Sequence, residues 1–257
     1  MSNLAMVLTE NVNLPSMEAF VDAFAELAGD QASLVRGSME KHEDEDSGTA
    51  LSFADSAGGR YMLVPMPAAV PDGEADQAAE YSVAALGSDW TLPEHGAHFV
   101  VTSAGEDPVD GDAYLADLMR FTWVLAAFAK VSGAVGVYWG GAGATHPADF
   151  FVEWAGGENM PIPLWSGVSI AGADEGRLSL LSLGGEVLGV PDLMIETPED
   201  EVEGALGFLF DLLDYIAQRG EAIPAGETVG RSEEERFEVQ HVPSPIEDDE
   251  LVQFVSM

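Results

Sequence analysis

Residues 118–148 form the longest stretch of the chain that contains no aspartate or glutamate. The whole chain has 257 residues, and its 46 acidic side chains against 9 basic ones give a formal net charge of −37. A neutral stretch in so acidic a chain is expected to be buried, because unpaired carboxylates are costly to bury. Arg120, Lys130 and the Ser132-Gly133 pair interrupt it, whereas a membrane-spanning helix needs about 20 apolar residues in succession. The stretch therefore predicts the buried centre of a globular fold.

The acidic side chains occur in nearly every other segment, a distribution typical of a solvated surface around a neutral core. A field of this sign repels phosphate backbones and anionic lipid surfaces, so neither nucleic-acid nor membrane binding is expected. It attracts basic proteins instead. Solubility or adaptation to a saline environment accounts for the same charge without any partner, and this alternative stays open. The first residues lack a basic region followed by a long apolar one, so the default expectation is a cytoplasmic location.

Signatures of metal, cofactor or nucleophilic chemistry are weak. The chain has no cysteine, which excludes disulfides and thiolate zinc sites. His95 and His98 point to opposite faces if they lie on an extended strand, so no metal site is predicted. The acidic runs at 43–46, 233–235 and 247–250 are typical of loops. Neither G-x-G-x-x-G, a Walker lysine nor G-x-S-x-G is present, so no cofactor is predicted and an enzyme is not favoured.

Two long helices are predicted, at 113–131 and 198–219. The first has apolar residues on several sides, which indicates a helix buried between layers. The second is expected to begin with Thr197 as its N-cap and to end at Gly220. A shorter helix is expected between Ser16 and Gly29. Strands are predicted at 5–9, on both sides of the turn at 57–59, near 97–104, at 134–139, within 161–196 and in the segments 236–242 and 251–256.

These elements favour a single α+β domain over residues 1–257, in which a mixed, mainly antiparallel sheet packs against the two long helices. Their order also allows a mixed α/β sheet. Residues from about 240 to 257 are interpreted as an acidic C-terminal tail.

The segment SGAVGVYWGGAGATHP at 132–147 is the main candidate for a binding site. Glycine-rich loops between a strand and a helix often bind phosphate through backbone N–H groups. A phosphate site would need a nearby cation, and the nearest preceding ones are Lys130 and Arg120. The favoured interpretation is therefore that the glycines allow a tight turn at the end of a buried strand and close packing of Trp139. The candidate ligand-binding residues are Tyr138, Trp139, Thr145, His146 and Glu196, the last because it ends an apolar strand just before a helix.

Several stretches resemble the bacterial family known as domain of unknown function 4261: LAMVLTE, HGAHFVVTSAG, GAVGVYWGGA, GGEVLGVPDLMIE and QRGEAIPAGETVGRSEEERFEVQHVPS. The resemblance covers nearly the whole chain, and its most specific part is GEAIPAGETVGRSEEERFEV. It implies one domain rather than two and supplies no activity, cofactor or catalytic residue.

The leading functional hypothesis is a non-enzymatic binding or regulatory module that contacts a basic protein partner, because the chain combines high negative charge with the lack of a catalytic motif. The alternative is a small-molecule-binding protein or enzyme with its pocket at the strand and loop 134–147, beside Tyr138, Trp139 and His146. The sequence gives no oligomeric state.

Overall fold

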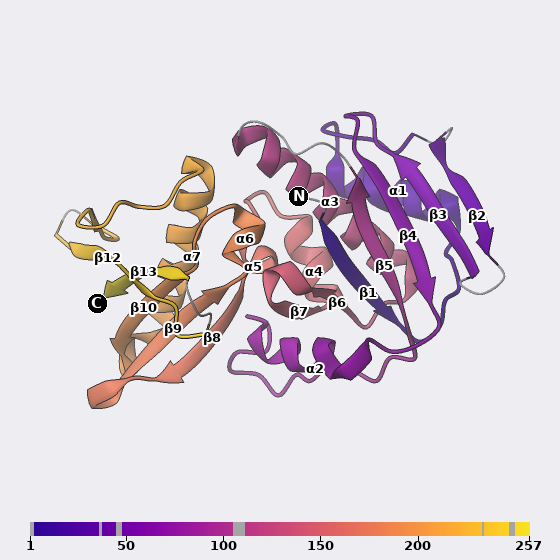
Figure 1. Ribbon diagram of the computed structural model, residues 1–257. Helices are drawn as coiled ribbons and strands as arrows, with labels where there is room; N and C mark the ends of the chain where they lie inside the picture. The colour runs from indigo at the N-terminus through magenta and orange to yellow at the C-terminus, as the bar shows by residue number, and fades with distance from the viewer. Residues whose placement is uncertain (1–2, 36–37, 45–47, 105–110, 233, 247–249) are drawn as a thin grey trace.

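The computed structural model describes residues 3–35, 38–44, 48–104, 111–232, 234–246 and 250–257. Its strands form two sheets that lie beside each other, with short helices between them (Figure 1). The α+β class and the predominance of antiparallel pairing are confirmed. The expectation of one sheet is wrong, because residues 167–256 build a second sheet of their own.

The first sheet has seven strands, each paired antiparallel to its neighbours. In spatial order these are β2 (Glu40–Asp44), β3 (Gly48–Ala54), β4 (Arg60–Met66), β5 (Ala97–Ala104), β1 (Leu4–Thr9), β6 (Gly136–Trp139) and β7 (Ala144–Pro147).

The second sheet has six strands: β11 (Thr228–Val229), β12 (Phe237–Pro243), β13 (Leu251–Ser256), β10 (Leu193–Pro198), β9 (Arg177–Leu183) and β8 (Gly167–Gly172). Its β10–β13 pair is parallel and its other pairs are antiparallel. The segment interpreted as an acidic tail therefore contributes β13, which is paired on both sides. The acidic runs are predicted to lie in loops, but residues 43 and 44 lie in β2; residues 45–46, 233 and 247–249 lie outside the described residues.

The helices are α1 (Met17–Ala28), α2 (Glu74–Ala78), α3 (Gly111–Ser132), α4 (Ala148–Ala155), α5 (Ile162–Trp165), α6 (Gly185–Leu188) and α7 (Val202–Arg219). Helix α3 contacts α1, α4 and α7, and every residue from 121 to 129 is buried, as the neutral stretch predicts. Helix α7 packs on β9 and β10. One hydrophobic core cluster joins Val7 and Leu63 of the first sheet to Ile195 and Val255 of the second.

The C-terminal end of α7 lies where the sequence predicts it, but the N-terminal end does not. Gly220 ends the helix with a left-handed backbone, φ +72°, as expected. The predicted start is wrong, because Thr197 is held in β10 opposite Leu178 of β9, and α7 begins at Val202 after the short 3₁₀ helix η6 (Glu199–Glu201). Strand pairing has overridden the local capping signal. Helix α1, in contrast, begins as predicted, since the Ser16 hydroxyl accepts a hydrogen bond from the Ala19 N–H.

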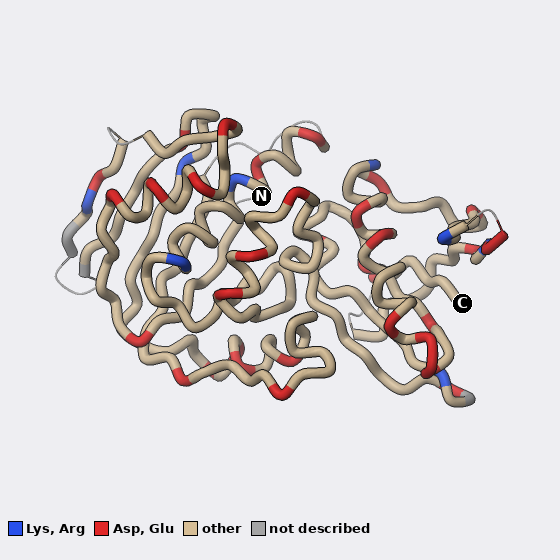
Figure 2. Tube along the Cα trace, turned by 180° about the vertical axis from the view of Figure 1, so that it is seen from behind, with Lys and Arg blue, Asp and Glu red and all other residues tan. Residues whose placement is uncertain are grey.

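Acidic residues are spread over both halves of the molecule, whereas lysine and arginine are sparse (Figure 2). Within the described part of the chain, no helix has the length and apolarity needed to span a bilayer.

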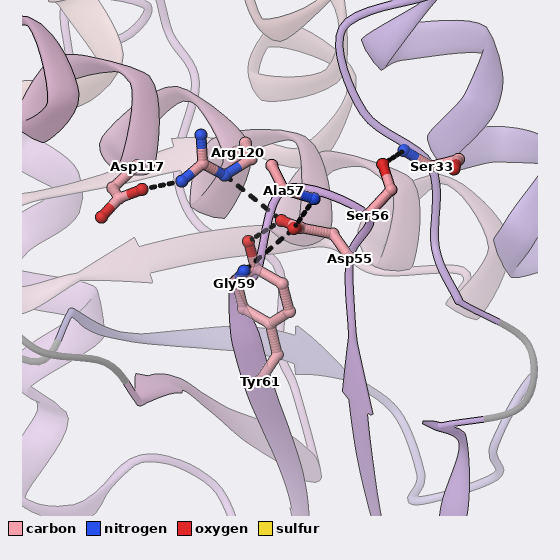
Figure 3. Close-up of polar contacts among 8 residues, drawn as sticks. All are labelled: Ser33, Asp55, Ser56, Ala57, Gly59, Tyr61, Asp117 and Arg120. Atoms are coloured by element: carbon pink, nitrogen blue, oxygen red, sulfur yellow. Dashed lines mark hydrogen bonds and ion pairs between the residues drawn. The ribbon is translucent and has the colours of Figure 1, made fainter.

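A buried carboxylate connects the β3–β4 turn to α3 (Figure 3). The Asp55 side chain is fully buried and accepts backbone hydrogen bonds from Ala57 (2.8 Å) and Gly59 (2.9 Å). Its other oxygen accepts from the Tyr61 hydroxyl at 2.6 Å and lies 3.3 Å from Arg120 Nε. Burial, followed by the contact with Asp55, raises the pKa of Tyr61, so the hydroxyl remains a donor. Three hydrogen bonds and one ion pair thus hold this carboxylate, and Arg120 is in addition paired with Asp117.

We expect Asp55→Asn to lower the free energy of unfolding by roughly 2–4 kcal/mol, because it breaks a buried ion pair and its hydrogen bonds. Asp30→Asn, which removes the same charge from an exposed position, should change it by less than about 0.5 kcal/mol. Urea unfolding of both variants measures the difference. Equal effects would show that Asp55 contributes only its charge.

Candidate functional site

The glycine-rich loop of the sequence forms a backbone contact between the two sheets. Its 3₁₀ helix η4 (Gly140–Ala142) connects β6 to β7 and contacts α6. A Cβ atom placed on Gly184, in the turn between β9 and α6, would lie 2.4 Å from the carbonyl oxygen of Gly141 and 2.6 Å from Cα of Ala142. One placed on Gly143 would lie 2.7 Å from Cβ of Leu183. The glycines therefore allow two backbones to approach closely, and we call this contact between 140–143 and 183–185 the glycine joint.

A cleft of about 450 Å³ opens at the glycine joint. Its volume lies within the range of about 300–1,000 Å³ typical of small-ligand sites. The walls come from α2 and the following 3₁₀ helix η3 (Ala79–Tyr81), from the β6–β7 loop, and from the segment between β9 and β10. Its polar side chains are those of Glu74, Gln77, Tyr81, Tyr138, Glu186, Asp192 and Glu250.

The charged residues among the described lining of this cleft are all acidic. Glu74 and Glu186 are exposed, so their carboxylates are open to a ligand. Asp192 is engaged in the fold, because it accepts hydrogen bonds from Ser182 Oγ (2.8 Å) and Gly185 N–H (2.9 Å). The cleft therefore favours a cationic group over an anionic one.

Tyr138 is the one predicted site residue that lines this cleft. Its hydroxyl lies 3.5 Å from Glu74 Oε2, a long hydrogen bond. Burial, and then the charge of Glu74, raise the pKa of Tyr138, so the hydroxyl keeps its proton. The exposed Tyr81 offers a second aromatic ring in the same cleft.

The other predicted site residues lie elsewhere. Trp139 is buried and packs edge-on against Phe121 of α3, with ring centroids 5.3 Å apart. Thr145 is buried on β7, where its hydroxyl donates to the Ala75 carbonyl at 2.7 Å. Glu196 lies on β10 in the second sheet, between Ser179 and Ser256. The β6–β7 hairpin thus pairs Tyr138 with Thr145, but of the predicted residues only Tyr138 reaches the cleft, and Glu196 lies in the second sheet.

His146 is fully buried and does not line the cleft. Its Nδ1 lies 2.8 Å from the Ser82 hydroxyl, and its ring stacks on Phe150 at 5.7 Å. Nε2 has no hydrogen-bond partner of good geometry among the described residues. Burial lowers the pKa of His146 to about 4, although the nearby Leu164 carbonyl opposes this shift. At pH 7 the imidazole of His146 is therefore neutral. It connects β7 to the end of η3, so its role is structural.

The two other histidines considered for metal binding also contact backbone. His98 Nδ1 lies 2.8 Å from the Ala68 carbonyl, and His95 Nε2 accepts from the Val70 N–H at 3.4 Å. Burial, opposed by the Ala68 contact, lowers the pKa of His98. Over the described ranges, no group of three or more potential ligand side chains surrounds a metal position.

Sequence reasoning missed Glu74 and Glu186, which lie far from Tyr138 along the chain. The only available signal was the second glycine pair, Gly184-Gly185, which matches Gly140-Gly141 as a place for close backbone approach.

We expect Gly184→Ala to destabilise the protein more than Gly226→Ala. Both glycines have positive φ, +92° and +87°, so both substitutions share a backbone strain of roughly 1–3 kcal/mol. Only Gly184 faces close atoms, which adds an overpacking cost of roughly 1–3 kcal/mol, whereas a Cβ at Gly226 meets open space. Urea unfolding compares the two. Equal losses would contradict close packing at the glycine joint.

We also expect His146 to make stability depend on pH. Its pKa falls from 6.5 to about 4 on folding, so as pH decreases the unfolded chain takes up this proton first. The stabilisation is complete above about pH 6.5 and is lost as pH falls towards 4, by about 3 kcal/mol in total. Unfolding of wild type and His146→Asn at a series of pH values isolates this effect, because the carboxylates titrate in both. Parallel curves would refute it.

The comparisons with known proteins concern the second sheet. A family model described as Domain of unknown function (DUF4261) matches residues 181–253, which include the β9–α6 side of the glycine joint. No curated protein and no solved structure matches the chain. The resemblance noted in the sequence is thus supported: residues 181–253 are similar to the family of domain of unknown function 4261.

Proposed function

We propose that this protein is a non-enzymatic binding module for a basic protein partner, and that the cleft at the glycine joint takes a lysine or arginine side chain of that partner. The observation that carries the proposal is the lining of the cleft, whose described charged residues are all acidic and stand beside Tyr138 and Tyr81.

The charge of the whole molecule supports a basic partner. Several of the few cations are already paired within the chain: Lys130 with Glu26, Arg219 with Glu221, and Arg231 with Glu235. These pairs leave a large acidic excess in a chain of net charge −37. Such a field speeds the approach of a positively charged protein and weakens as salt is added.

The chemistry of the cleft supports recognition of a single cation. Glu74 and Glu186 can each accept a charge-assisted hydrogen bond from an ammonium or guanidinium group. The rings of Tyr138 and Tyr81 offer faces for cation–π contact. Carboxylates together with aromatic faces bind a cation in two independent ways.

A small cationic metabolite is the second candidate, because the volume of the cleft suits a free ligand as well as a side chain. A polyamine carries the required positive charge but can fill only the cleft, so spermidine serves to distinguish a small ligand from a protein partner.

We expect the double variant Glu74→Gln/Glu186→Gln to bind a lysine-rich peptide at least about tenfold more weakly than wild type, because two charge-assisted hydrogen bonds are lost. The matched control Glu18→Gln/Glu40→Gln removes the same charge from exposed positions outside the cleft and should change affinity less than about twofold. Titration calorimetry at low and moderate salt measures both.

Equal weakening in the two double variants would mean that the surface acts as an ion exchanger and would contradict a cleft-centred site. Spermidine binding that is lost only in the cleft variant, without binding of the peptide, would favour the small-ligand candidate.

A further inference from the structure

The two sheets end in four edge strands, and three of these edges are blocked. β2 has the charged sequence EKHED. β7 has four residues, ends in a proline and is contacted by α2 and η3. β11 has two residues. β8, with the sequence GVSIAG, has neither a charge nor a proline. Edge strands of soluble proteins are normally protected by charge, proline, short length or cover, so β8 is the exception among the described strands.

The outer half of β8 is accessible. Gly167 and Val168 are buried, and Gly167 lies near Tyr81 of η3. Ile170, Ala171 and Gly172 are exposed, and Ile170 has 37% of its surface open to solvent. The free stretch is therefore 169–172.

The hairpin geometry shows which backbone groups are free. The Ala173 N–H donates to the Arg177 carbonyl at 2.9 Å, so residue 173 faces β9. Backbone groups alternate along an antiparallel strand, and those of Ile170 and Gly172 therefore point away from β9. Among the described residues, none outside β9 forms a backbone hydrogen bond with either.

The side chain of Ile170 ends a row of apolar residues. It is paired with Leu180 of β9, which is paired with Ile195 of β10, and both of these are fully buried. An apolar side chain placed beside Ile170 would extend this row. A neighbouring strand would thus gain both main-chain hydrogen bonds and an apolar contact, as in strand addition to a sheet edge.

We propose that the edge of β8 binds an extended, basic segment of the partner protein as an added strand; this inference rests on the proposed function. A second copy of the chain would bring another net charge of −37 to the same edge. A basic segment is attracted instead, since the exposed Asp174 follows Gly172 closely in sequence, and the exposed Glu80 adjoins Tyr81, which packs against Gly167 at the start of β8. The guanidinium of Arg177 is directed away from β8, since it donates to the Glu196 and Met257 carbonyls on the other side of β9.

The test uses a short synthetic peptide in which valine and lysine alternate, added to the full-length protein. Hydrogen exchange should show protection of the amides of Ile170 and Gly172 when the peptide binds. Ile170→Pro removes an outward N–H, which an edge strand tolerates. It should weaken binding at least about tenfold, whereas Ile170→Val, which keeps that N–H, should stay within about threefold.

A second peptide with the same sequence and alternate N-methylated amides keeps its charge and loses its outward donors, so wild type should bind it at least about tenfold more weakly. This comparison uses only the wild-type protein, so it tests strand addition at β8 even if Ile170→Pro fails to fold. Equal binding of both peptides, without protection at 170 and 172, would overturn the edge proposal and leave a purely electrostatic partner site. Failure of both peptides to bind at low salt would overturn the proposed function as well. A wild-type dimer that becomes monomeric in Ile170→Pro would assign the edge to a second copy.

Discussion

The close approach of two backbones at the glycine joint is the constraint on which the arrangement of this protein depends. Gly184 meets Gly141 and Ala142 at distances that leave no room for a side chain. Because of this contact, the segment between β9 and β10 reaches the end of β6. Glu186 and Asp192 of this segment therefore line the same cleft as Tyr138 of β6. The cleft is a consequence of the joint, since its walls come from both sheets and from α2.

The acid-free part of the sequence lies largely in the interior of the fold, and the acidic parts form most of its surface. The acid-free stretch provides residues 118–132 of α3, which packs on α1, α4 and α7, together with the strand that leads to the glycine joint. Among the described residues, the one fully buried acid is Asp55, which accepts three hydrogen bonds and pairs with Arg120. The remaining acids stay largely at the surface, so the molecule carries a strong negative field around a neutral centre. Within that field, the cleft and the uncharged β8 edge are the places at which we propose that a partner binds.

The sequence predicted those features whose signals are local. Ser16 and Gly29 enclose α1, the glycines at 58–59 separate β3 from β4, and the neutral stretch becomes the buried part of α3. Prediction failed where distant segments decide the outcome. Thr197 has every local feature of an N-cap, yet pairing with β9 keeps it in a strand. Likewise, no local pattern shows that Glu74 and Glu186 share a cleft with Tyr138, because the glycine joint between the sheets creates that neighbourhood.

We expect the glycine joint and the shared core to make the two sheets one cooperative unit, which native-state hydrogen exchange can measure. The amides to compare are Val101 in β5 and Ile195 in β10, both fully buried at the centres of their sheets. If the sheets unfold together, the two amides exchange with the same free energy of opening and the same dependence on denaturant. A clearly lower opening free energy for one of them would contradict a single cooperative unit, since that sheet would then unfold alone and the cleft would be a contact between independent parts.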